Sequence, residues 1–179
     1  MSMWEETYLK PLIPSLKGTR ENKTVIFLRG ISGSGKSVLC NFLFKSLGGV
    51  EKVVCCSADN FFIKNGVYKF DSNKLPEAHE ACINTMEQAL QNTSIRFVIV
   101  DNTHTQLWHM SKGETIAKAH GASVLVIEIV VPDRTHFILC QKRQQHSVPE
   151  LVHLDQWLKW ENHPTPFARI PMFISDEKK

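Results

Sequence analysis

The stretch that decides the fold is Gly30-Ile31-Ser32-Gly33-Ser34-Gly35-Lys36-Ser37, which has the spacing G-x-x-x-x-G-K-S. It directly follows the apolar run 25–28, whose length and composition are typical of a buried strand. The glycines allow a tight turn in which successive backbone N–H groups point at an anion, and a helix starting near Lys36 adds the positive end of its dipole. This order of strand, loop and helix predicts a phosphate-binding loop, the P-loop, and therefore a nucleoside triphosphate site.

Each residue of this loop has an expected contact. The backbone of four residues is expected to surround the phosphates of ATP: Ser32, Gly33, Ser34 and Gly35. Lys36 should reach the β- and γ-phosphates, and the Ser37 hydroxyl should ligate Mg²⁺. ATP and Mg²⁺ are therefore the predicted cofactors. A glycine-rich turn that only caps a helix is the alternative.

The composition is that of a globular protein with one domain. The chain has 179 residues, of which 42% are hydrophobic and 22% charged, and it contains no apolar run long enough to span a membrane. A formal charge of +3 permits a nucleic-acid substrate without requiring one. The five cysteines include the adjacent pair Cys55 and Cys56 but no C-x-x-C spacing, which predicts buried free thiols. We therefore expect an intracellular protein, in the cytoplasm or the nucleus.

Predicted strands and helices alternate along the chain. Strands are expected at 24–29, 52–57, 97–100 and 123–131, and helices at 36–47, 76–91, 106–119 and 150–161. The segment 61–74 is expected to be irregular. The alternation is typical of an α/β fold in three layers, in which helices cover both faces of a mostly parallel central sheet, as in P-loop NTPases. The β-branched stretch 123–131 is expected to be a central strand.

Two carboxylates are predicted to lie at the same edge of the sheet as the P-loop. Asp59 and Asp101 each follow a predicted strand, and ligands of parallel sheets bind at the carboxyl ends of the strands. Asp101 occupies the place where P-loop proteins hold Mg²⁺, and Asp59 is a candidate general base for an incoming hydroxyl. The alternative for each is an aspartate that caps a turn or helix. His104 and His146 lack metal-ligand spacing and are expected to make ordinary polar contacts.

A basic segment after the stretch 123–131 is expected to form a helical lid. Residues 134–143 are able to close over the nucleotide, and Arg143 is the candidate donor to the migrating phosphate charge. A solvated basic helix face is the alternative. Trp157 and Trp160, three residues apart on a predicted helix, are expected to pack in the core rather than to stack on a base.

Several further motifs accompany the P-loop in order along the chain. They are Ser57-Ala58-Asp59-Asn60-Phe61-Phe62, Gly66-Val67-Tyr68-Lys69-Phe70, Val100-Asp101-Asn102-Thr103-His104 and the segment 143–149. With these motifs the chain resembles the P-loop polynucleotide kinase-like family. That family includes the phage 5′-hydroxyl polynucleotide kinases, the kinase modules of tRNA ligases and the P-loop domain of cyclic-nucleotide phosphodiesterase.

The resemblance implies a reaction. It implies ATP-dependent transfer of the γ-phosphate to the 5′-hydroxyl end of RNA or DNA, as in nucleic-acid repair. Asp59 would activate the acceptor hydroxyl, and Arg143 would stabilise the transferring phosphate. We expect residues 24–175 to form the P-loop kinase domain, after a lead-in over 1–23 and before a charged tail over 176–179.

The chain also departs from the family pattern. Phe62 stands where the phage enzymes carry an arginine that contacts the acceptor strand, and Gln144 and Ser147 replace the usual residues of the lid. Two other functions therefore stay open: a P-loop kinase that acts on a small molecule, and a non-catalytic module that binds ATP and a protein partner.

Overall fold

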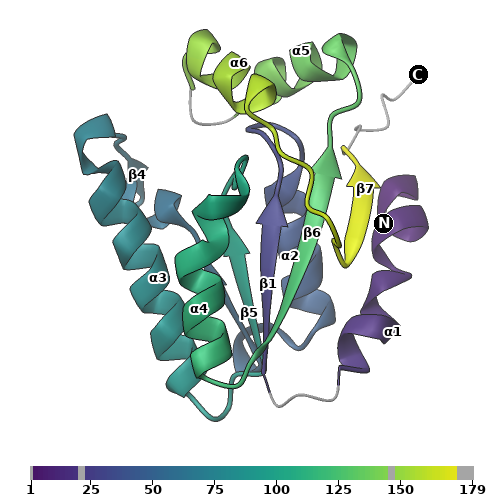
Figure 1. Ribbon diagram of the computed structural model, residues 1–179, viewed down its shortest axis with the longest axis vertical. Coiled ribbons are helices and arrows are strands. Elements are labelled where there is room, and N and C mark those ends of the chain that lie inside the picture. Colours follow the sequence, from purple (N-terminus) through teal and green to yellow (C-terminus); the bar gives the residue numbers. More distant parts are fainter. Residues whose placement is uncertain (1, 20–22, 145–147, 173–179) are drawn as a thin grey trace.

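The core of the fold is a sheet of five parallel strands. The computed structural model describes residues 2–19, 23–144 and 148–172. The strands lie in the order β2-β5-β1-β6-β7 (Figure 1). Their bounds are β1 Thr24–Arg29, β2 Val53–Cys56, β5 Phe97–Asp101, β6 Ser123–Val130 and β7 Ala168–Pro171. The predicted strands are confirmed to within one or two residues at their ends. β6 lies inside the sheet, between β1 and β7, whereas β1 is the middle strand.

Helices cover both faces of this sheet. α3 Leu75–Gln91 and α4 Ser111–Ala119 lie on one face, and α1 Leu12–Lys17 and α2 Lys36–Ser46 on the other (Figure 1). Successive side chains of a strand point to opposite faces, so β1 contributes to two separate cores. Val25 and Phe27 pack on the α3–α4 side, while Ile26 and Leu28 pack on the α1–α2 side. The predicted three-layer P-loop NTPase architecture is confirmed.

The first residues are more structured than a lead-in. A π-helical turn, Glu5–Leu9, precedes α1, and Leu9 and Leu16 are fully buried against the sheet. Pro11 and Pro14 do not prevent this, because each of the two helical segments is short and Pro is tolerated in the first turn of a helix. The N-terminal segment therefore belongs to the core that α2 and the sheet form.

Two other segments also differ from the expectation. The stretch expected to be irregular contains a small antiparallel hairpin, β3 Ile63–Lys64 and β4 Val67–Tyr68, which turns at Asn65 and Gly66 with positive φ at both. β7 was not predicted, because four residues without an alternating pattern give little signal. Short 3₁₀ turns occur in four of the connections: Gly49–Glu51, Ala58–Phe62, Ser72–Lys74 and Leu107–Met110.

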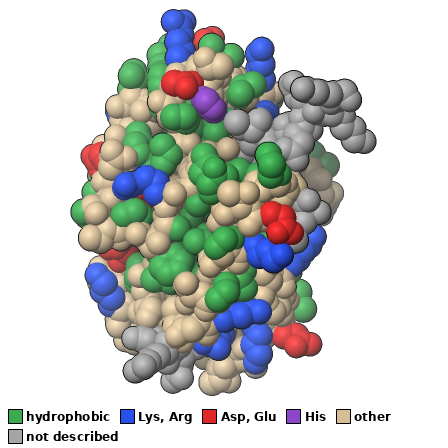
Figure 2. Space-filling view, turned by 90° about the vertical axis from the view of Figure 1, so that its right-hand side faces the viewer, with side chains coloured by type: hydrophobic (Ala, Val, Ile, Leu, Met, Phe, Trp, Pro, Cys, Tyr) green, Lys and Arg blue, Asp and Glu red, His purple; other side chains and the backbone are tan. Residues whose placement is uncertain are grey.

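The last helices lie at the functional edge of the sheet. α5 Arg134–Arg143 and α6 Glu150–Leu158 lie across the end toward which β1 points (Figure 1). On the face that carries α1 and β7, hydrophobic side chains form a band through the middle, and most Lys and Arg side chains lie toward the edges (Figure 2). None of the helices in the described part of the chain is long and apolar enough to cross a membrane.

Candidate phosphotransfer site

The P-loop connects β1 to α2 in a conformation that needs its glycines. Gly33 and Gly35 have φ values of 78° and 108°, which side chains rarely tolerate. The Lys36 ammonium folds back and donates to the carbonyl oxygen of Ile31 over 3.0 Å. The Ser34 hydroxyl is buried and has no hydrogen-bond partner among the described residues. The left-handed glycines, the contact of Lys36 with Ile31 and the buried Ser34 hydroxyl therefore define a tightly turned loop between β1 and α2.

Ser37 and Asp101 lie side by side at the end of the sheet. The pairing of Leu28 with Asp101 sets the end of β5 next to the start of the P-loop. The Ser37 hydroxyl lies 3.5 Å from a carboxylate oxygen of Asp101. A hydroxyl and a carboxylate are the hard oxygen ligands that Mg²⁺ prefers, and Mg²⁺ takes its remaining ligands from phosphates and water. The residues present therefore fit a magnesium ion bound together with a nucleotide.

Asp59 lies at the same edge, in the 3₁₀ turn after β2. Ser57 caps this turn by accepting from the Asp59 N–H over 3.3 Å, and Asn102 accepts from the Ala58 N–H over 2.9 Å. The Asp59 carboxylate accepts a hydrogen bond of 2.9 Å from the Tyr68 hydroxyl. The cap of the turn is thus Ser57, and the Asp59 carboxylate is held by a residue of the hairpin.

The electrostatics connect these groups. Burial lowers the pKa of Lys36, and the carboxylates of Asp101 and Asp59 act in the opposite direction. Both carboxylates are therefore close enough to influence the P-loop ammonium. Burial and the hydrogen bond to Asp59 raise the pKa of the Tyr68 hydroxyl, which keeps it protonated as a donor.

His104 follows β5 but has a structural role. Its Nδ1 donates to the carbonyl of Leu28 over 2.9 Å, and burial lowers its pKa to about 3. A neutral, buried imidazole agrees with the ordinary polar contact expected for it. His146 and Ser147 lie outside the described residues.

The lid touches the P-loop directly. A β-carbon added to Gly33 would overlap with the carbonyl oxygen of Cys140, so α5 passes over the loop at backbone distance. Arg143 is the last residue of α5, about one turn beyond Cys140. From α6, Gln156 accepts from the Ser32 N–H over 3.0 Å, and the His153 imidazole bonds the Ser32 carbonyl over 2.7 Å. In this conformation the backbone of Ser32 faces the lid.

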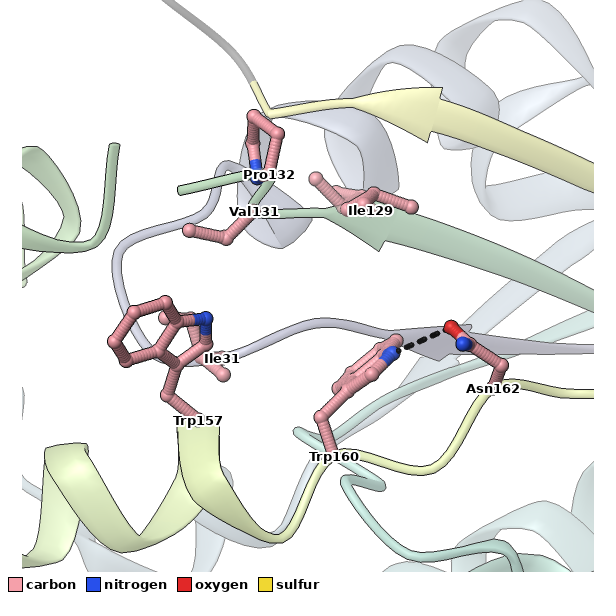
Figure 3. A pocket seen from close by; sticks show the side chains of 8 residues that line it. Ile31, Ile129, Val131, Pro132, Trp157, Trp160 and Asn162 are labelled. Atoms are coloured by element: carbon pink, nitrogen blue, oxygen red, sulfur yellow. Dashed lines mark hydrogen bonds between the residues drawn. The ribbon is translucent and has the colours of Figure 1, made fainter. Parts of the chain in front are cut away.

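A cavity of about 300 Å³, lined mostly by apolar residues, lies between the P-loop, the end of β6 and α6 (Figure 3). Its lining comprises Ile31, Ile129, Val130, Val131, Pro132, Trp157, Trp160 and Asn162. Trp157 stacks on Phe137 of α5 with ring centroids 4.7 Å apart, and Trp160 donates to Asn162 over 3.1 Å. The two indoles thus pack partly against their neighbours, as predicted, and partly line the cavity.

Most of these residues were predicted from the sequence to lie together, and others were not. Lys36, Ser37, Asp59 and Asp101 do meet at one edge of the sheet. Gln156, which bonds the P-loop from α6, was missed because an amide on a helix carries no motif. Tyr68 was noticed as part of a motif, but its contact with Asp59 depends on the hairpin.

Comparisons with known proteins identify the family of this chain. Residues 25–166 match the family described as AAA domain (AAA_33). Human NEDD4-binding protein 2 is 36% identical over 104 residues, which are 58% of this chain and 6% of that protein. The chain therefore spans a small part of this relative.

Solved structures share the fold at low sequence identity. The Pnkp1/Rnl/Hen1 complex has a chain with a TM-score of 0.59 and 17% identity, over 89% of this chain and 49% of that one. The APS kinase CysC of Mycobacterium tuberculosis, in complex with AMPPNP and APS, has a TM-score of 0.55 and 18% identity, over 89% and 92%. At such identities the likeness concerns the fold alone.

Proposed function

Because this chain belongs to the AAA domain family and has a P-loop kinase-like fold, we propose that it transfers the γ-phosphate of ATP to the 5′-hydroxyl end of RNA or DNA. The observation that carries the proposal is the meeting of Lys36, the Ser37–Asp101 pair and Asp59 at one edge of the sheet. A P-loop alone indicates nucleotide binding. A carboxylate near that loop, from the turn that follows a separate strand, adds the group that a transfer to a hydroxyl requires.

Each residue has a role in this reaction. Asp59 accepts the proton of the 5′-hydroxyl as its oxygen attacks the γ-phosphorus, and the bond from that phosphorus to the bridging oxygen breaks to release ADP. Lys36 and Arg143 stabilise negative charge on the transferring phosphate and the leaving oxygen. Backbone N–H groups of Gly33 to Ser37 hold the phosphates in line. Mg²⁺, held by Ser37 and Asp101 when bound, neutralises phosphate charge.

The hairpin beside Asp59 supports a nucleic-acid acceptor. Ile63, Val67 and Phe70 expose 48%, 53% and 50% of their surface, and Lys64 and Lys69 are exposed between them. The exposed Phe70 ring suits stacking on a base, Ile63 and Val67 suit apolar contact beside it, and the lysines suit backbone phosphates. The Tyr68 hydrogen bond links this surface to the proposed base.

Phe62 fits this arrangement although it replaces the arginine of the phage enzymes. Its side chain is 3% exposed and packs between Phe61, Tyr68 and Phe70. It holds the hairpin in place rather than contacting the acceptor. Recognition of the acceptor strand therefore falls to the exposed residues of the hairpin.

The test is label transfer from γ-labelled ATP. An oligonucleotide with a 5′-hydroxyl should become labelled, and the same sequence with a 5′-phosphate should not. Asp59→Asn should lower turnover by about 10² to 10⁴ with ATP binding nearly unchanged, whereas Lys36→Ala should impair both. Asp71→Asn is the matched control, because Asp71 caps a nearby turn by accepting from the Asn73 N–H. An unlabelled 5′-hydroxyl end at saturating ATP would refute the proposal, and ATP binding without any turnover would favour the interaction module.

A small-molecule acceptor is the second candidate. The likeness to the APS kinase extends over 92% of that chain, and the absence of an arginine at Phe62 removes one contact to a strand. This candidate predicts phosphoryl transfer whose KM for the acceptor changes little with salt. A polynucleotide acceptor predicts a steep salt dependence instead.

A further inference from the structure

Two thiols lie in contact behind the P-loop, and the reaction proposed above uses neither of them. The Cys40 thiol, on α2, donates to the Cys55 sulfur, on β2, over 3.4 Å. Cys40 lies one helical turn beyond Lys36, and Cys55 lies four residues before Asp59. We propose that Cys40 and Cys55 form a redox-responsive dithiol site, which a peroxide converts to a disulfide between α2 and β2.

The geometry singles out this pair among the described cysteines. A disulfide requires an S–S distance of about 2.05 Å, so the two sulfurs must approach by a little over 1 Å. Cys56 follows Cys55 on the strand but packs in the core on the opposite face of the sheet. Cys82 accepts from the Asn102 amide over 3.5 Å, and Cys140 contacts the Met172 sulfur over 3.8 Å.

The contact between the Cys40 and Cys55 thiols also indicates which of them reacts first. The hydrogen bond from Cys40 lowers the pKa of Cys55, and that bond together with burial raises the pKa of Cys40. Cys55 is also partly exposed, whereas Cys40 is 6% exposed. Cys55 is therefore the thiolate that a peroxide reaches first, and Cys40 is the resolving thiol.

The reaction balances with a peroxide as the oxidant. The Cys55 thiolate attacks one peroxide oxygen, the O–O bond breaks, and Cys55 becomes a sulfenic acid with release of one water. The Cys40 sulfur then attacks the Cys55 sulfur, the S–O bond breaks, and a second water leaves. The two thiols lose two electrons and two protons in total, and the peroxide gains them.

The disulfide would act on the nucleotide site. α2 begins at Lys36 and β2 leads into the turn that carries Asp59, so drawing the two elements together shifts the P-loop against that turn. We expect oxidised protein to bind ATP more weakly and dithiothreitol to restore the affinity. The thiol chemistry itself does not depend on the proposed kinase activity.

The experiment measures the bond first. The full chain is treated with one equivalent of hydrogen peroxide, the remaining thiols are alkylated, and the protein is digested with trypsin without reduction. Cleavage after lysine places Cys40 in peptide 37–45 and Cys55 in peptide 53–64. We expect these peptides to appear joined, two hydrogens lighter than their sum, with two of the five titratable thiols consumed.

Variants assign the sulfurs, because peptide 53–64 also contains Cys56. Cys56→Ser should keep the cross-link, and Cys55→Ser should lose it together with the peroxide effect on ATP binding. Fragmentation of the wild-type cross-linked peptide makes the same assignment without any variant. Complete alkylation of Cys40 and Cys55 after peroxide, or a cross-link at Cys56, would overturn the proposal.

Discussion

The Asp59 carboxylate accepts a hydrogen bond from the Tyr68 hydroxyl, and one substitution removes that hydroxyl while keeping the aromatic ring. Tyr68→Phe deletes the 2.9 Å hydrogen bond and keeps the ring against Phe62, at 6.2 Å between centroids. A hydrogen bond to a charged group contributes about 1.5–3 kcal/mol, so we expect kcat for label transfer to fall by roughly tenfold to a hundredfold. KM for ATP should stay near the wild-type value, because Tyr68 lies outside the P-loop. Unchanged kcat would show that the hydroxyl does not orient the carboxylate.

His104 predicts how stability depends on pH. Its pKa is about 3 in the folded protein, against an ordinary value of 6.5 that we assign to the unfolded chain. Between these values the unfolded chain binds a proton that the folded chain does not. The free energy of unfolding should therefore fall as pH drops below 6.5, by up to about 1.4 kcal/mol per pH unit, with no effect of this group above that pH. Denaturant titrations at pH 7 and pH 5 measure this difference in the free energy of unfolding.

A variant isolates this histidine. His104→Asn places an amide N–H near the Leu28 carbonyl and tolerates the positive φ of 43° at this position. It should flatten the pH dependence of unfolding. An unaltered slope in His104→Asn would assign the dependence to other groups.

The residues of the site differ in how far the sequence alone could place them. Lys36 and Ser37 belong to one local motif, Asp101 ends an apolar strand and Asp59 follows another, so their meeting follows from the rule for parallel sheets. The Tyr68–Asp59 bond follows from no such rule, because it depends on a hairpin of two-residue strands. Arg143 stays a prediction.

At the scale of elements, a buried ion pair joins β1 to β6 at the base of the P-loop. Arg29 and Glu128 are both fully buried and paired in register, and Arg29 also donates to the carbonyls of Thr105 and Glu161. Glu128→Gln removes the carboxylate that pairs with both Arg29 and Arg169 and should cost about 3–5 kcal/mol of unfolding free energy. Urea denaturation measures this. Asp155→Asn, in an exposed pair with Lys159, should cost at most about 1 kcal/mol. Equal losses would contradict the argument.

The close approach of the lid to the P-loop is testable at Gly33. In Gly33→Ala the new β-carbon would overlap with the Cys140 carbonyl oxygen, at a residue with φ of 78°. The loop or α5 must move, so we expect ATP affinity to fall by about tenfold or more, equivalent to about 1.4 kcal/mol. Isothermal titration calorimetry measures the dissociation constant for ATP.

Gly121→Ala is the matched control for this variant. Gly121 has a similar φ of 67°, but nothing lies within 4 Å of its added β-carbon. It should lose about 1 kcal/mol of stability through backbone strain and keep its ATP affinity. If both variants bind ATP like the wild type, close contact between α5 and the loop is not needed for nucleotide binding.

Elements with strong periodic patterns were predictable, and short elements held by distant contacts were not. β1, β5 and β6 are apolar runs bounded by polar residues, a pattern that predicts a strand directly. β7 has four residues and is fixed by pairing with β6 and by a hydrogen bond from the Trp4 indole to Pro171. Those contacts join residues that are far apart in the sequence. The residues around 168–171 alone therefore do not predict this strand.

Across the whole molecule, the N-terminal segment and β7 complete one side of the fold. Leu9 and Leu16 are fully buried, and Trp4 bonds the last residue of β7. The two ends of the described chain consequently lie on the same side, away from the hairpin β3–β4 (Figure 1). The surface that we assign to the acceptor and the surface formed by the chain ends are therefore separate.

The net charge of the whole molecule decides where a polynucleotide acceptor would have to bind. The chain carries 21 basic and 18 acidic side chains, a net charge of +3, which is too small for a general attraction to nucleic acid. Affinity for a 5′-hydroxyl oligonucleotide must then come from a local patch. The double variant Lys64→Ala/Lys69→Ala should weaken binding and reduce the slope of log K against log salt by about 0.7 for each phosphate that a lysine no longer neutralises. Lys10→Ala, at the N-terminal end, should leave the slope unchanged, and an equal effect of both would place the acceptor elsewhere.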